Sequence, residues 1–214
     1  AQLLADMKPA FMRFPGGCVV EGCTMENRWQ WKKTIGPVHQ RPGHWSLWGY
    51  RNTDGLGYHE FLQLCEDLGA QGMFVINCGL SCEGRNGDFW PDDKIPELIQ
   101  DALDACEYAL GPVDSKWGAL RAQAGHPEPL PLQYVEIGNE NHGPRYEALY
   151  QRFAAALQQA YPQLTLIADV HIDGSEMHDQ HFYVAPPFFL QNYGRYDQAP
   201  RRDDSGRPMP RVYV

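Results

Sequence analysis

Hydrophobic and polar positions follow two spacings along the chain, and together these are typical of an α/β protein. Three stretches, 58–68, 95–110 and 146–161, repeat their apolar residues at helical spacing, so each predicts a helix with one buried face. Short, almost continuous apolar runs lie between them, as in parallel strands that are buried on both faces. We expect about six strands, at 11–14, 72–77, 134–138, 165–169, 179–183 and 211–214. Strands that alternate with helices predict a parallel sheet.

The ends of the predicted helices add detail. Residues 1–8 have the pattern of a helix end. Asp93 is expected to cap the N-terminus of the helix 95–110, because a short acidic side chain can accept hydrogen bonds from the first free N–H groups. A loop that contains Trp117 and His126 is expected between this helix and the next strand.

Polar side chains gather where the predicted strands end. They are Arg13, Asn77, Asn139 with Glu140, and His181 with Tyr183. Enzymes built on (β/α)8 barrels present their catalytic groups at the C-terminal ends of the strands, so this clustering favours a barrel over a doubly wound sheet. The strand 134–138 matters most, because a carboxyl group and an amide follow its tip directly. No GxGxxG or P-loop pattern indicates a nucleotide.

The connection 18–57 is long, shows little periodicity and is dense in aromatic residues, Gly and Pro. A long irregular loop inside a compact domain is usually functional. Its aromatic residues include Trp29, Trp31, Trp45 and Trp48. Their rings suit either stacking on the apolar faces of sugars or a small satellite core, and the sequence leaves both interpretations open.

The composition of the chain argues against two classes of binding partner. The chain has 214 residues and a net charge of −9, with no basic cluster beyond Arg201-Arg202, which argues against nucleic acid and anionic membranes. No apolar run approaches the roughly 20 residues of a membrane helix. The first residue is Ala, which suggests a mature form or a fragment and leaves secretion open.

The cysteines and histidines predict no metal site and no cofactor. The six cysteines form no CxxC pair and have no zinc spacing, and the histidines form no HExxH motif. Cys65 and Cys106 lie on apolar helix faces and are expected to be buried thiols. Two loop pairings are left open, Cys18 with Cys23 and Cys78 with Cys82.

Several short motifs follow one another in a definite order. They are Arg13-Phe14-Pro15-Gly16-Gly17-Cys18, Gly36-Pro37, Arg41-Pro42-Gly43-His44, Asp54-Gly55-Leu56-Gly57 and Gly138-Asn139-Glu140. In this order they resemble the α-L-arabinofuranosidases of glycoside hydrolase family 51 over nearly the whole chain. The resemblance implies a single partial catalytic domain over 1–214. Its fold would be an incomplete (β/α)8 TIM barrel with about strands two to six and the start of strand seven. The family's accessory β-sandwich would be absent.

The resemblance also implies roles for particular residues. Glu140 matches the general acid/base, and Asn139 matches the amide that holds the sugar 2-hydroxyl. Arg13 matches an arginine near the nucleophile, and Cys18 matches the floor of the sugar pocket. Trp48 aligns with a loop tryptophan that walls this pocket.

Three further substrate-binding candidates lie at other strand tips. Asn77 is included because it is the polar tip of the predicted strand 72–77. His181 and Tyr183 match a His-x-Tyr pair, with Tyr183 touching the nucleophile. Many relatives carry Glu where this chain has Gln180, which leaves the local charge open.

A retaining mechanism needs two carboxyl groups about 5–5.5 Å apart, one of them held protonated. We therefore expect burial and the second carboxylate to raise the pKa of Glu140. The nucleophile is expected directly after Val214, so the chain alone should be poorly active. The sequence is expected to be an internal piece of a larger catalytic domain.

The resemblance implies double displacement that removes terminal α-L-arabinofuranosyl residues from arabinoxylan or arabinan. Two alternatives remain: an endo-β-1,4-glucanase or xylosidase of the same family, and a non-catalytic carbohydrate-binding protein. An incomplete barrel exposes sheet edges, so it should be marginal as a monomer unless it self-associates or is held by another chain. A secreted or periplasmic location is favoured.

Overall fold

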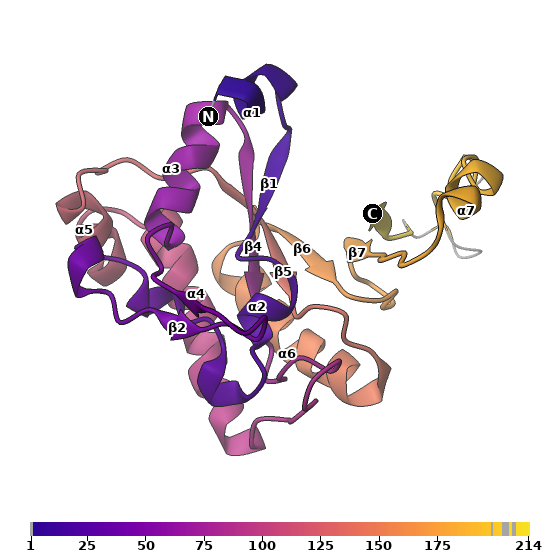
Figure 1. Ribbon diagram of the computed structural model, residues 1–214, viewed down its shortest axis with the longest axis horizontal. Helices are drawn as coiled ribbons and strands as arrows, with labels where there is room; N and C mark the ends of the chain where they lie inside the picture. Colours follow the sequence, from indigo (N-terminus) through magenta and orange to yellow (C-terminus); the bar gives the residue numbers. More distant parts are fainter. Residues whose placement is uncertain (1, 198, 203–205, 207–208) are drawn as a thin grey trace.

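The computed structural model describes residues 2–197, 199–202, 206 and 209–214, and its centre is one sheet of six parallel strands. The strands are β1 (Phe11–Phe14), β4 (Gln71–Ile76), β5 (Leu132–Ile137), β6 (Thr165–Ala168), β7 (Met177–Asp179) and β8 (Arg211–Tyr213). They lie side by side in chain order, and the sheet curls into an open part of a (β/α)8 barrel (Figure 1). The predicted fold class is therefore confirmed.

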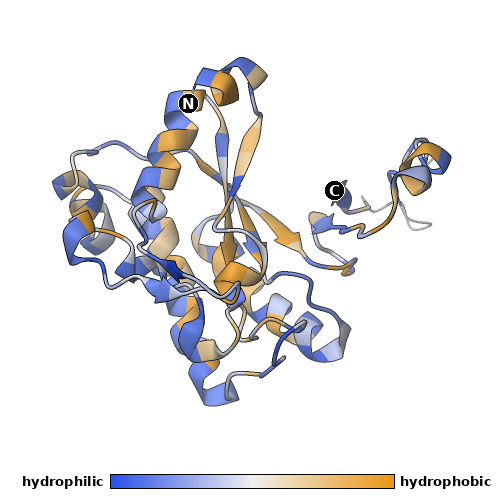
Figure 2. Cartoon of the chain, in the orientation of Figure 1, coloured by the Kyte–Doolittle hydropathy of each residue, from blue (hydrophilic) through white to orange (hydrophobic). Residues whose placement is uncertain are grey.

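Three long helices cover the outside of this sheet. They are α3 (Tyr58–Leu68), α4 (Ile95–Leu110) and α6 (Gly143–Ala160), and each buries one apolar face as its periodicity predicted. Figure 2 shows the apolar residues concentrated on the central strands and the polar residues on the outward faces of the helices. The short helix α1 (Gln2–Met7) precedes β1, in agreement with the predicted helix end.

The connection 18–57 is more ordered than its sequence predicts. It contains helix α2 (Gly17–Glu21), the 3₁₀ turns Met25–Asn27, Trp31–Lys33 and Val38–Gln40, and a small hairpin of β2 (His44–Trp45) and β3 (Arg51–Asn52). Trp29 and Trp31 are buried whereas Trp45 and Trp48 are exposed, so stacking of the exposed rings on sugars stays a prediction. The Trp31 ring lies 4.9 Å from the Trp117 ring, centroid to centroid, and both rings belong with Trp29 to the main hydrophobic core and not to a separate satellite core.

Three local predictions were wrong. Helix α5 (Lys116–Gln123) occupies the expected loop, and its amphipathic pattern is weak because it is short and contains Gly118. Asp93 does not cap α4, because it lies in a 3₁₀ turn (Asp92–Lys94) that runs directly into that helix. The strand expected at 179–183 is β7, which ends at Asp179, so the segment that follows is a loop. The short helix α7 (Pro186–Gln191) was also missed.

Helix α5 carries the largest fully buried side chain among the described residues, that of Arg121. Its guanidinium donates to the carbonyl oxygens of Tyr108 and Gly111 at 2.8 Å, and to those of His126 and Pro127 at 3.1 and 2.8 Å. Arg121 thus joins the end of α4 to the loop that enters β5.

Replacing Arg121 with methionine should destabilise the fold strongly. The apolar side chain leaves four carbonyl groups without their donor, and each unsatisfied buried group costs about 1–3 kcal/mol. We expect a loss of at least about 3 kcal/mol in the free energy of unfolding, measured by urea denaturation. Arg152→Met, on the exposed face of α6, is the matched control and should change stability by less than about 0.5 kcal/mol. Equal effects of the two variants would contradict this role for Arg121.

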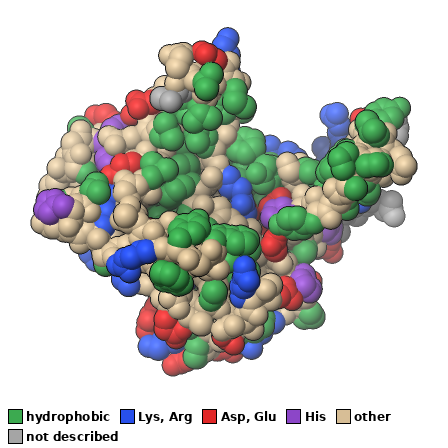
Figure 3. Space-filling view, in the orientation of Figure 1, with side chains coloured by type: hydrophobic (Ala, Val, Ile, Leu, Met, Phe, Trp, Pro, Cys, Tyr) green, Lys and Arg blue, Asp and Glu red, His purple; other side chains and the backbone are tan. Residues whose placement is uncertain are grey.

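The end of the chain departs from the main body. The segment with α7 projects away from the helices that cover the sheet (Figure 1). Figure 3 shows apolar side chains on this projection, among which Leu190 and Tyr193 are 77% and 90% exposed. Among the described residues, no helix has the length and apolar character needed to cross a bilayer.

Candidate active site

A buried ion pair forms the base of the site. Arg13 near the end of β1 donates through Nε to Oε2 of Glu136 in β5 at 2.6 Å, and a second Arg13 nitrogen donates to Oε1. Glu136 is fully buried. Burial raises the pKa of Glu136, while the hydrogen bond and charge of Arg13 oppose that shift. Such a bidentate pair fixes both side chains across the sheet, where a parallel register already aligns the strands.

Arg13 also orients Asn139, because its Nη2 donates to Oδ1 of Asn139 at 2.9 Å. The amide nitrogen of Asn139 is then turned the other way and lies 3.9 Å from the Cys18 sulfur. Glu136 was not among the residues that the sequence indicated for the site. In the sequence, Glu136 is a single charged residue within an apolar strand. The alternation of polar and apolar residues does not show that its partner is Arg13.

Glu140 lines a cavity of about 230 Å³, together with Asp169, Asp179, His181 and Tyr183. Its Oε1 is 2.7 Å from Nδ1 of His181 and accepts a hydrogen bond from the Tyr183 hydroxyl. Its Oε2 lies 3.8 Å from the Cys18 sulfur. The structure therefore brings the predicted strand-tip residues Arg13, Asn139, Glu140, His181 and Tyr183 together, with Cys18 below them.

The pKa of Glu140 is lowered, whereas the sequence led us to expect a raised value. Burial alone would raise this pKa, but hydrogen bonds from Tyr183 and His181 and the charge of His181 outweigh burial and lower it. Burial would lower the pKa of His181, but Glu140 and Asp179 outweigh this effect and raise it. The cause is the loop after β7, which turns His181 toward both carboxylates, with its Nε2 2.6 Å from Asp179.

Replacing His181 with asparagine should raise the pKa of Glu140 toward its usual value, as followed by carboxyl ¹³C NMR. The pair of Glu140 and charged His181 stabilises the fold above the unfolded pKa of Glu and below that of His, between about pH 4.5 and 6.5. It is lost at lower pH as Glu140 protonates and at higher pH as His181 deprotonates. His142→Asn is the control, because His142 pairs with Glu83 at 3.2 Å. An unchanged Glu140 titration in His181→Asn would contradict the ion pair.

A tight turn aims Glu140 into the cavity. Gly138 has φ 94° and Glu140 has φ 58°, both in the left-handed region. A Cβ on Gly138 would lie 2.6 Å from Nδ2 of Asn141 and 2.7 Å from Oδ2 of Asp169, so only glycine fits there. The hydroxyl of Tyr146 donates to the carbonyl of Ile137 at 2.8 Å and fixes the strand just before the turn.

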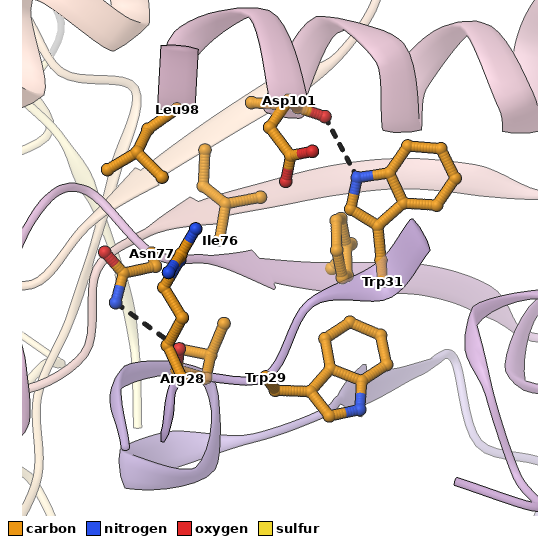
Figure 4. Close-up of a pocket in the computed structure, with 10 residues that line it drawn as sticks. Arg28, Trp29, Trp31, Ile76, Asn77, Leu98 and Asp101 are labelled. Carbon is orange, nitrogen blue, oxygen red and sulfur yellow. Dashed lines mark hydrogen bonds between the residues drawn. The ribbon is translucent and has the colours of Figure 1, made fainter. Parts of the chain in front are cut away.

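Two candidate residues lie elsewhere. The side-chain amide of Asn77 donates to the carbonyls of Val20 and Leu80 and accepts from the Gly79 N–H, so its polar atoms are engaged by backbone. Figure 4 shows Asn77 in a separate small cavity with Arg28 and Ile76. Trp48 is 57% exposed and lies under the Arg85 guanidinium at 5.4 Å, and it does not line the Glu140 cavity.

The six cysteines are all free thiols, so neither of the two loop pairings forms. Cys65 and Cys106 are buried, as predicted. Burial, with the neighbouring Cys82 thiol, raises the pKa of Cys18 to about 12, which keeps this thiol neutral beside Glu140. No group of three or more His, Cys, Asp or Glu side chains within the described ranges is arranged to hold a metal ion.

Comparison with known proteins gives a consistent result. The family profile described as the alpha-L-arabinofuranosidase 1 domain matches residues 3–201. Alpha-L-arabinofuranosidase 1 of Arabidopsis thaliana is 40% identical over 94% of this chain and 30% of its own length. The extracellular exo-alpha-L-arabinofuranosidase of Streptomyces chartreusis is 36% identical over 94% of this chain and 28% of its own length.

A solved structure agrees with these relatives. An arabinose-bound GH51 α-L-arabinofuranosidase superposes with a TM-score of 0.86 and 37% identity, covering 96% of this chain and 33% of the other. The chain thus spans about a third or less of the length of the relatives named here.

Proposed function

Because the chain belongs to the α-L-arabinofuranosidases of family GH51, we propose that it carries the acid/base half of a retaining exo-glycosidase. The enzyme would remove terminal α-L-arabinofuranosyl residues from arabinoxylan or arabinan. The observation that carries this proposal is the position of Glu140. It lies at the tip of a central parallel strand, beside a fixed amide and facing a cavity.

In the first step, the carboxyl group of Glu140 gives its proton to the glycosidic oxygen as the bond to the anomeric carbon breaks. A second carboxylate attacks that carbon from the opposite face and forms a covalent glycosyl-enzyme. In the second step, Glu140 takes a proton from water, whose oxygen then displaces the carboxylate. Asn139 would donate from Nδ2 to the sugar 2-hydroxyl, since Arg13 already holds its Oδ1.

We place the second carboxylate at the tip of β8, directly after Val214. Tyr213 pairs in parallel register with Asp179, so the end of β8 faces the same edge of the sheet as the Glu140 cavity. A negative charge there would raise the pKa of Glu140. Glu140 would then keep the proton that the first step needs up to a higher pH than it does when it is paired with His181 alone.

The remaining candidates take supporting roles in this proposal. Cys18 would form the floor of the sugar pocket, and Tyr183 holds the carboxyl group of Glu140 through its hydroxyl and would touch the second carboxylate as well. Trp48 would wall the pocket only if a bound glycan draws the exposed hairpin inward. A secreted or periplasmic location is supported by the Streptomyces relative, whose name states that it is extracellular. Exposed apolar side chains near α7 support self-association of the isolated chain.

Product analysis tests the proposal. The full-length protein is incubated with arabinoxylan, arabinan and a linear β-1,4-glucan, and the released sugars are separated by chromatography. Free L-arabinose as the first product supports exo action. Oligosaccharides from the linear glucan would instead favour the endo-glucanase, xylose as the first product would favour the xylosidase, and no product from any glycan would favour a binding protein. The 214-residue chain by itself should have little activity, because the mechanism needs both carboxylates.

A further inference from the structure

Two buried acidic side chains lie beneath the Glu140 turn and take no part in the mechanism above. Glu21 ends helix α2, and Asp169 directly follows β6. Glu21 is 1% exposed and Asp169 is 8% exposed, and Asn141 between them is 1% exposed. These three side chains come from segments far apart in the sequence and meet directly behind the acid/base residue.

Both acids bond to the residue that follows Glu140. The Asn141 side-chain nitrogen donates to Oε1 of Glu21 at 2.8 Å, and the Asn141 backbone N–H donates to Oδ2 of Asp169 at 2.9 Å. The Asp169 N–H donates to the Tyr146 hydroxyl at 2.7 Å, and this hydroxyl in turn donates to Ile137. The turn that carries Glu140 is thus held from two sides through Asn141.

The side chains around these two carboxyl groups are mainly acids and thiols, and of the described basic side chains His142 and His181 border the same cavity as Asp169. The titratable groups that face Glu21 are Glu83, Glu140, Asp169, Cys18, Cys78 and the nearby Cys82, and those that face Asp169 are Glu136, Glu21, Cys78 and Tyr146. No ion pair joins either acid to a basic side chain of the described residues. Two ionised carboxylates around one buried amide would be costly.

Three buried atoms without hydrogen-bond partners indicate that protonation of an acid removes the cost of the buried charges. Oε2 of Glu21, Oδ1 of Asp169 and Oδ1 of Asn141 are buried and lack hydrogen-bond partners. While the two acids are ionised, their oxygens can only accept hydrogen bonds, as the amide oxygen of Asn141 does. A protonated acid can instead donate its O–H to that amide oxygen. Burial raises the pKa of Glu21 to about 8, although hydrogen bonds from the Asn141 side chain and the Asn139 backbone oppose this, and burial raises the pKa of Asp169 well above its usual value.

We propose that Glu21 is a positioning residue that acts as a neutral carboxylic acid: together with Asp169 it clamps Asn141 and so aims Glu140 at the substrate. Loss of the Glu21 proton puts a buried negative charge against Asp169 and behind Glu140, and the clamp loosens. Because the neutral form of Glu21 is the one that holds Asn141, the clamp is intact below about pH 8 and is lost as pH rises through that value.

The first test does not depend on catalysis. Backbone and side-chain amide signals of Asn139 and Asn141 are followed by ¹⁵N NMR from pH 5 to pH 9.5 in the chain and in Glu21→Gln. The glutamine amide mimics the neutral acid and has no proton to lose. We expect a transition near pH 8 in the wild type and none in Glu21→Gln. In Glu83→Gln the transition should persist at a somewhat lower pH, because the charge of Glu83 is one of the effects that raise the pKa of Glu21. A flat wild-type titration, or a transition that survives in Glu21→Gln, overturns the proposal.

The second test uses turnover and therefore rests on the proposed function. In the full-length protein at pH 6, Glu21→Gln should keep kcat/KM close to the wild-type value and should maintain it to higher pH. Glu21→Ala removes the clamp, and a misplacement of about 1 Å can cost about 100-fold in rate. Equal losses in Glu21→Gln and Glu21→Ala would contradict the neutral-acid role. If no variant hydrolyses arabinofuranosides, the proposed function fails, while the NMR titration still decides the clamp.

Discussion

Glu140→Gln should lower kcat/KM of the full-length protein for an aryl α-L-arabinofuranoside by about 10²–10⁴-fold, the usual contribution of general acid–base catalysis. Glutamine keeps the size of the side chain and its contacts with His181 and Tyr183, so the fold and the cavity should persist. It cannot give a proton to the glycosidic oxygen. The loss should be largest for natural glycans and smaller for substrates whose leaving group is a strongly acidic phenol, because these need less protonation.

Glu83→Gln is the matched control for this prediction. Glu83 lines the same neighbouring cavity as Glu140 but pairs with His142 at the surface. It should leave kcat/KM within about twofold of wild type, since it changes charge without touching the proposed reacting atoms. A Glu140→Gln protein as active as the Glu83→Gln protein would remove Glu140 from the mechanism.

Arg13→Met should lower the free energy of unfolding by about 3–5 kcal/mol, because it leaves the fully buried Glu136 without its partner. The side chain of methionine fills much of the space of the arginine stem, so the effect reports the lost pair and not a large cavity. Asn139 loses its Nη2 donor at the same time, so sugar binding should weaken as well. Urea denaturation at pH 7 measures the stability change.

The double variant Arg13→Met/Glu136→Leu separates the ion pair from packing. Replacing both charges with apolar residues of similar size is often neutral or stabilising, so the double variant should recover most of the stability that Arg13→Met loses. If the double variant is as unstable as Arg13→Met alone, the cost lies in packing around β1 and β5, and the buried-charge explanation is wrong.

The features that could be predicted from the sequence are those that depend on which residues of a helix or strand are buried. The periodicity of 58–68 and 95–110 reflects one buried helix face, and the apolar run at 72–77 reflects a strand covered on both sides. Glu140 could be found because it follows such a strand directly. Helix α5 could not, since a short helix held mainly by the polar anchor Arg121 has little apolar periodicity.

The contacts that tune the site were beyond the sequence, because they join residues far apart in the chain. Arg13 meets Glu136 across 123 positions, and Asn141 meets Glu21 across 120. The lowered pKa of Glu140 depends on a turn after β7 that brings His181 and Tyr183 back over the strand tip. Alternation and spacing give the face on which a residue lies, but not its partner on that face.

The central claim is that Glu140 serves a retaining double displacement with a second carboxylate at the tip of β8. The most direct measurement is ¹H NMR of the anomeric proton of L-arabinofuranose during the first turnovers of the full-length protein on an aryl α-L-arabinofuranoside. Two displacements at the same carbon restore its configuration, so we predict that the α-anomer is released first and only later equilibrates. Initial release of the β-anomer would mean a single displacement by water and would contradict the account.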